Sequence, residues 1–110
     1  MPKEGKMATY VTLYRFTEQG ARNIQDSPKR VDRIRQMFKE HGCEIREFYA
    51  LMGQFDTMIV ATAPNDEAIL RLNLAIDAMG NVTSQTMRAF DEKEFRAMVQ
   101  AIQPMMAKAA

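Results

Sequence analysis

The chain of 110 residues is of ordinary size for one domain and too short for two. Apolar residues make up 46% of it and charged residues 26%, which is a globular composition and not a disordered one. The 15 basic and 14 acidic residues are mixed along the chain and give a net charge of +1. This balance supplies no basic patch for a phosphate backbone, so we expect no nucleic-acid partner.

Targeting and membrane signals are also missing from the sequence. No apolar run approaches the roughly 20 residues of a membrane span, and the first residues, MPKEGKM, lack the apolar stretch of a secretory signal. Cys43 is the only cysteine and cannot form an internal disulfide. We expect a cytoplasmic protein without a membrane partner.

The first predicted strand covers residues 8–16, where β-branched and aromatic side chains dominate. Because side chains alternate along a strand, Val11 and Leu13 share one face, with Thr9 and Arg15 at its ends. The other face carries aromatic and hydroxylated side chains together: Tyr10, Thr12, Tyr14 and Phe16.

A polar connection, TEQGARNIQDSPKR, follows this strand and is expected to hold a helical turn around residues 21–24. Asp26 or Ser27 fits the N-cap of a longer helix, and Pro28 fits its first position, where a missing N–H does no harm. Gly42 can adopt the left-handed conformation that ends the helix. Its apolar stripe is expected to be Val31, Ile34, Met37, Phe38 and His41.

Two further strands are predicted at residues 43–52 and 57–63, and another helix comes after them. Asn65 or Asp66 fits the N-cap of this helix, and Gly80 fits its end. Its inward stripe is expected to consist of Ile69, Leu72, Ala75, Ile76 and Met79.

The strongest local signature belongs to a C-terminal helix that follows a fourth strand at residues 81–90. Asp91 and Glu94 match an acidic variant of the capping box, and Phe90 and Phe95 have the spacing of a hydrophobic staple. The apolar face of this helix is expected to be Phe95, Met98, Val99 and Ile102.

The order of these elements is strand, helix, strand, strand, helix, strand, helix. This order predicts an α+β, ferredoxin-like βαββαβ fold with an antiparallel sheet and an extra C-terminal helix. Pro104 predicts the end of that helix. We therefore expect one domain at residues 7–104, with flexible termini at residues 1–6 and 105–110.

The stretch LMGQFDTMIV could hold either a turn or a chemical site. Gly53-Gln54 suits a type II′ hairpin turn, which would pair Leu51 with Asp56. Asp56 could then accept hydrogen bonds from backbone N–H groups near the turn. As a base or ligand contact, Asp56 lacks a partner at recognisable spacing. We therefore prefer the turn.

The segments TYVTLYRFTEQGARNIQDSPKR, GQFD and GNVTSQTMRAFDEKEF, taken together, resemble the GYD domain family of bacterial proteins. The resemblance covers about residues 7–97. The family is named after a Gly-Tyr-Asp signature in this hairpin, where the present chain has Phe55 at the tyrosine position, with Gln54 intervening after Gly53. The resemblance implies a ferredoxin-like fold of the dimeric α+β barrel group. It implies no activity.

Helices can cover only one face of such a sheet, so the other face meets solvent, a ligand or a second subunit. We expect the face with Tyr10, Thr12 and Tyr14 to be this open one. The fourth strand contributes one of two alternative sets, either Thr83, Gln85 and Met87 or Ser84, Thr86 and Arg88. Covering the open face predicts a homodimer or a larger even homo-oligomer with a cavity between subunits.

Three arginines could bind a carboxylate or phosphate if the fold brings them together, although arginines at strand ends usually pair with surface acids. The stretch QGARN is the preferred loop for ligand contacts. The candidate ligand-binding residues are Tyr10, Thr12, Tyr14, Arg15, Arg22, Asn23 and Arg88. Gly53, Phe55 and Asp56 form a structural motif.

His41 is the only histidine, and its place at a helix C-terminus is explained by capping and by the helix dipole. Together with Cys43 it would still need further ligands to hold a metal, so we expect neither a metal nor a cofactor. No nucleophile elbow, phosphate loop or dinucleotide fingerprint is present.

Two functions follow as hypotheses. The first is a non-catalytic oligomeric module that binds a small, partly apolar molecule or a protein partner through the open sheet face. The second, by fold analogy alone, is a cofactor-independent isomerase or monooxygenase of the dimeric α+β barrel type. Its candidate proton carriers would be Tyr10, Tyr14 and His41.

Overall fold

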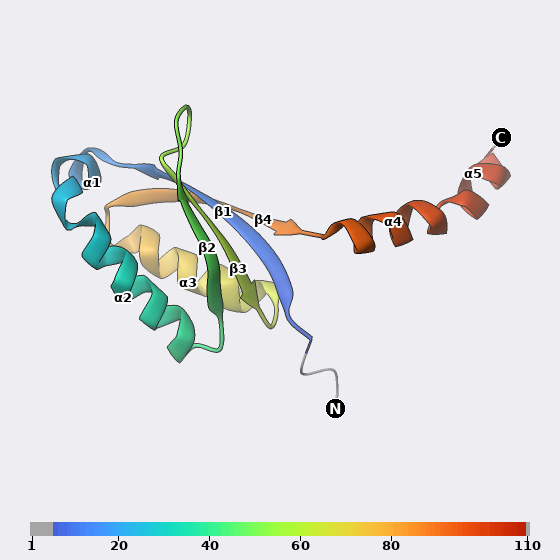
Figure 1. The fold of residues 1–110 in the computed structure, drawn as a ribbon, viewed down its shortest axis with the longest axis horizontal. Helices are drawn as coiled ribbons and strands as arrows, with labels where there is room; N and C mark the ends of the chain where they lie inside the picture. Colours follow the sequence, from blue (N-terminus) through green and yellow to red (C-terminus); the bar gives the residue numbers. More distant parts are fainter. Residues whose placement is uncertain (1–5, 110) are drawn as a thin grey trace.

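The computed structural model describes residues 6–109, and its centre is a four-stranded antiparallel sheet (Figure 1). The order of the strands is β2-β3-β1-β4, with every neighbouring pair antiparallel. Their bounds are β1 Ala8–Phe16, β2 Glu44–Ala50, β3 Thr57–Ala63 and β4 Val82–Ala89. The predicted α+β class and the four antiparallel strands are confirmed.

Two helices cover one face of this sheet: α2, Ser27–Glu40, and α3, Asp66–Ala78 (Figure 1). Between helices and sheet lies the core, which consists of Tyr10, Tyr14, Phe38, Cys43, Ile45, Ile59, Ala61, Ala63, Ile69, Leu72 and Ile76. No helix within residues 6–109 is long and apolar enough to cross a membrane. None of the described helices lies over the opposite face of the sheet.

The ends of these helices follow the local signals in the sequence. Asn65 is the N-cap of α3 and accepts a hydrogen bond from the Ala68 N–H at 2.9 Å. Asp26 occupies the N-cap of α2, although its side chain makes no capping bond. Gly42 follows α2 with a φ of +77°, the left-handed conformation predicted for it.

The inward stripe of α3 differs from the prediction at three positions. Ala75 and Met79 were expected inside and are exposed. Asn73 is buried instead, with only 2% of its surface exposed. An amide can enter a core only where its donors and acceptor find partners, and those partners come from the sheet.

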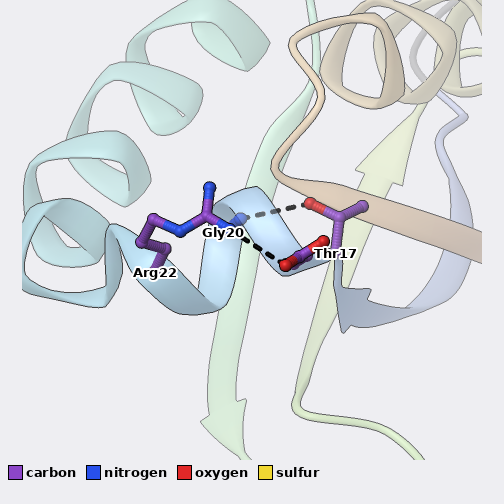
Figure 2. A network of polar contacts seen from close by, with 4 residues as sticks. Thr17, Gly20 and Arg22 are labelled. Atoms are coloured by element: carbon purple, nitrogen blue, oxygen red, sulfur yellow. Dashed lines mark hydrogen bonds and ion pairs between the residues drawn. The ribbon is translucent and has the colours of Figure 1, made fainter.

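The polar connection after β1 forms a short helix, α1, at Glu18–Arg22, followed by the 3₁₀ turn η2 at Ile24–Asp26. The Thr17 hydroxyl caps α1 by accepting a hydrogen bond from the Gly20 N–H at 3.1 Å (Figure 2). The Thr17 N–H donates to the carbonyl of Asn81 at 3.0 Å. The connection is therefore held against the loop between α3 and β4.

The chain ends in a C-terminal arm, which we define as Glu92–Ala109 and which contains α4, Glu92–Ala101, and α5, Gln103–Ala109. The arm extends away from the sheet (Figure 1). The radius of gyration is accordingly 17.1 Å, against about 13 Å for a compact domain of about this size. The predicted capping box between Asp91 and Glu94 is confirmed.

Residues 105–109, expected to be part of a flexible terminus, continue as helix α5. The predicted end of the preceding helix is confirmed, because α4 ends at Ala101, before Pro104. Pro104 itself lies in the first turn of α5, where no backbone N–H is needed. The other predicted flexible segment, residues 1–6, lies outside the described residues except for Lys6, and so does Ala110.

Candidate functional site

The face of the sheet opposite the helices has an apolar centre. Val11 on β1 lies opposite Val60 on β3 and Met87 on β4, while Leu13 lies opposite Met58. The strand register thereby gathers side chains from three strands into one patch. We call this patch and its rim the uncovered face: Val11, Leu13, Met58, Val60 and Met87 at the centre, with Thr9, Arg15, Glu44, Glu47, Tyr49, Thr62, Thr83 and Gln85 around it.

Surface exposure agrees with this register. Val11, Leu13, Met58 and Val60 are half-buried, and Met87 is 38% exposed. An apolar patch with a polar and charged rim is typical of a surface that binds another protein. The uncovered face is therefore the first candidate site.

The prediction that Tyr10, Thr12 and Tyr14 lie on the open face is wrong. They are 2%, 0% and 6% exposed, respectively, and they point toward α3. Alternation along β1 correctly separates its two faces, but it does not say which of them the helices cover. The same register assigns Thr83, Gln85 and Met87, and not Ser84, Thr86 and Arg88, to the uncovered face.

A buried polar network joins β1, β4 and α3. The Tyr14 hydroxyl donates to the amide oxygen of Asn73 at 2.6 Å. The Asn73 amide nitrogen donates to the hydroxyls of Thr12 at 3.2 Å and Thr86 at 3.0 Å. These bonds satisfy polar groups inside the core and fix α3 on the sheet. Sequence reasoning missed Asn73, because only the tertiary contacts place it between two strands.

Tyr10 and Tyr14, on the helix-covered face of the sheet, both have raised pKa values. Burial raises the pKa of Tyr14 well above its ordinary value, and the nearby Asp77 carboxylate adds to the effect. Burial, followed by the hydrogen bond to Asp66, raises the pKa of Tyr10 to about 12. A neutral phenol with an occupied hydroxyl serves well as a structural donor and poorly as a proton carrier near neutral pH.

The fold does not bring the three candidate arginines together. Arg15 lies on the uncovered face, whereas Arg88 lies on the helix side at the other end of the strand pair. The Arg15 Nε donates to the Gln54 carbonyl at 2.9 Å. Arg22, on α1, pairs with Glu18 at 3.0 Å. A shared site for a carboxylate or phosphate is absent from this arrangement.

Two of these arginines lie against aromatic rings. The Arg15 guanidinium lies 5.1 Å from the centre of the Phe55 ring. The Arg88 guanidinium lies 4.3 Å from the ring of Phe90. Such contacts are typical cation–π pairs. The residues around Asn23 form the junction of α1 and η2, where the Asn23 carbonyl accepts a bond from Arg30 at 3.2 Å.

The hairpin between β2 and β3 is fastened to β1. The Leu51 N–H donates to the Asp56 carbonyl at 2.9 Å, in the predicted pairing, and Gly53 has a φ of +117°. The Asp56 carboxylate accepts a bond from the Phe16 N–H at 2.8 Å, not from an N–H near the turn. The Asp56 N–H donates to the Tyr14 carbonyl at 2.8 Å. Asp56 therefore has a structural role, since its hydrogen bonds hold the hairpin against β1.

His41 and Cys43 also have local explanations. The imidazole Nδ1 of His41 lies 2.9 Å from the carbonyl of Met37, at the C-cap of α2. Cys43 is buried, which raises the pKa of its thiol. Within the described part of the chain, no group of three His, Cys, Asp or Glu side chains could hold a metal ion.

A groove between α2 and the sheet is the second candidate site. Its volume is about 540 Å³, within the range of small-molecule sites. Apolar side chains from both walls line it, among them Ile24, Val31, Ile34, Phe48, Ile59 and Val82. Tyr14 and Asp56 lie at its sheet side, with their polar groups already bonded within the protein.

Comparison with known proteins adds two findings. The family model described as GYD domain matches residues 10–99. A relative from Thermus thermophilus, named glutamine synthetase and cystathionine beta-lyase binding protein, is 26% identical over 84 residues. The aligned region spans 76% of this chain and 88% of the relative.

Proposed function

The chain belongs to the GYD domain family, and we propose that it is a non-catalytic protein-interaction module that binds its partners through the uncovered face. The observation that carries the proposal is the apolar centre formed by Val11, Leu13 and Val60 on the side of the sheet without helices. The name of the Thermus relative, which describes it as binding two other proteins, supports the same class of function.

Self-association belongs to this proposal. Exposure of an apolar sheet face to water is unfavourable, so covering it with another surface stabilises the protein. A second copy of the chain supplies such a surface, because every copy carries the same face. We propose a homodimer or a larger even homo-oligomer. We also propose that the fold is ferredoxin-like, since the strand order β2-β3-β1-β4 is compatible with it. Direct sheet-to-sheet pairing, as in the dimeric α+β barrel group, is one of two arrangements that would cover the uncovered face.

Replacing Met87 with glutamate tests the binding surface. The substitution places a charge at the apolar centre on an exposed side chain of an edge strand, so the monomer keeps its fold. We expect self-association in sedimentation velocity to weaken at least about 10-fold, because a desolvated charge costs more than 1.4 kcal/mol. Binding of purified glutamine synthetase and of cystathionine beta-lyase, measured by interferometry, is expected to weaken in parallel where it occurs.

The matched control is Leu70→Glu, which makes the same kind of change on α3, where Leu70 is 54% exposed on the helix side. This variant should associate like the unchanged chain. A monomeric unchanged chain that binds neither enzyme would contradict the proposed function, as would equal effects of the two substitutions.

The groove supports a second candidate function, the binding of a small, partly apolar molecule. Filling it from α2 with Val31→Trp should abolish binding of the probe 8-anilinonaphthalene-1-sulfonate, followed by its fluorescence. Gln36→Trp is the control, because Gln36 is on the same helix, is exposed and does not line the groove. Equal dye binding by both variants would rule the groove out.

A further inference from the structure

The C-terminal arm carries an apolar stripe that no other segment among residues 6–109 covers. Phe95, Met98, Val99 and Ile102 follow the spacing of one helix face, and all are exposed. Met105 and Met106 extend the exposed apolar surface along α5. The opposite side of α4 is polar or small: Lys93, Arg96, Ala97 and Gln100. Exposing such a stripe to water is unfavourable, so the helix that carries it is stabilised when a partner surface covers the stripe.

The arm leaves its own sheet in a direction that local bonds fix. Asp91 has an extended conformation, with φ −75° and ψ 176°, and its carboxylate accepts a bond from the Glu94 N–H at 2.8 Å. The Glu94 carboxylate returns a bond to the Asp91 N–H at 2.9 Å. This reciprocal box sets the angle at which α4 begins, and α4 then points away from the body (Figure 1).

The stripe of the arm and the uncovered face are therefore both exposed on one chain, and the arm does not lie on its own uncovered face. Direct pairing of two uncovered faces would leave both arms bare. Exchange of arms between two copies covers both surfaces at once, and a two-fold axis makes the two contacts identical.

We propose that the arm of one copy lies across the uncovered face of a second copy, with its apolar stripe on the centre formed by Val11, Leu13 and Val60. The dimensions agree. The arm has 18 residues, 17 of them in α4 and α5, and at a helical rise they span about 27 Å, while four strands are about 15 Å wide. The inference rests on the proposed function and deepens it: the arm occupies the surface that other proteins use, so a bound protein and the arm compete for it.

Substitutions in the full chain test the role of the stripe. Met98→Glu with Ile102→Glu adds two charges to the stripe, whereas Ala97→Glu with Gln100→Glu adds the same two charges to the opposite side of α4. We expect the dissociation constant of the homo-oligomer, from sedimentation velocity, to rise about 100-fold for the first pair. It should change less than about 3-fold for the second pair.

Cross-linking identifies the surface. A Met58→Cys chain is mixed with an Ile102→Cys chain under oxidising conditions; the natural Cys43 is only 4% exposed and does not compete. We expect a disulfide-linked dimer of two different chains, which non-reducing electrophoresis and mass spectrometry detect. A chain that carries both substitutions and links only within itself would overturn the inference.

The outcomes separate the two proposals. An unchanged chain that is monomeric and binds no protein overturns the proposed function together with the inference. An oligomer that is lost in Met87→Glu, but is insensitive to the stripe charges and forms no mixed disulfide, overturns only the exchange of arms.

Discussion

Replacing Gly20 with alanine is expected to destabilise the protein by about 3 kcal/mol, the upper range for inserting a methyl group into a closed contact. A Cβ on Gly20 would lie 2.0 Å from the carbonyl oxygen of Asn81, and both that oxygen and its carbon belong to the backbone. Because the Thr17 N–H is bonded to the same carbonyl, α1 and the loop would have to separate. Urea denaturation measures the loss.

The direction of the stability change distinguishes a steric clash at Gly20 from the ordinary effect of helix propensity. Gly20 is inside α1, where alanine normally stabilises a helix by about 1 kcal/mol. Gly42→Ala is the control, since its Cβ would meet nothing within 4 Å and only the left-handed φ of +77° opposes it. That variant should lose about 1 kcal/mol. A Gly20→Ala protein as stable as the unchanged chain would show that α1 does not pack against Asn81 as described.

Replacing Asn73 with leucine is expected to cost about 2–4 kcal/mol, because it leaves buried hydroxyls without partners. The Tyr14 hydroxyl loses its acceptor, while Thr12 and Thr86 keep only each other at 3.0 Å. The loss is measured from the midpoint and slope of the urea transition. Asn23→Leu, at an exposed position, should change stability by no more than about 0.5 kcal/mol.

A double substitution distinguishes the hydrogen bond from simple packing. Tyr14→Phe removes the hydroxyl that Asn73→Leu would leave unsatisfied, so the pair should cost less than the sum of the two single changes, by about 1 kcal/mol or more. Additive losses would mean that the 2.6 Å contact does not contribute to stability.

Local patterns in the sequence predicted the elements and several of their ends. The capping box of Asp91 and Glu94, the cap at Asn65 and the stop at Gly42 depend on residues within four positions of one another, so the sequence alone contains the whole interaction. The order of strands and helices likewise predicted a four-stranded antiparallel sheet. The turn residues predicted the position of the hairpin at Gly53, although residues 51–56 form a loop and not the expected two-residue turn.

Long-range contacts decided what the sequence left open. The alternation along β1 defines two faces, but both contain apolar residues, and the choice between them depends on where α2 and α3 pack. The Asp56 carboxylate accepts a hydrogen bond from Phe16, 40 residues away, and the Asn73 side chain donates hydrogen bonds to residues on both β1 and β4. Tyr10, Thr12 and Tyr14 were therefore assigned to the wrong side.

The same distinction between local patterns and long-range contacts applies to the candidate site. Sequence alone predicted an α+β fold in which helices leave one face of the sheet uncovered, because period and composition are local properties. Only the tertiary structure showed that Val11, Leu13 and Val60 form the uncovered face and that the arm extends away from it. Burial depends on the packing of segments far apart in the chain, and no local pattern encodes that choice.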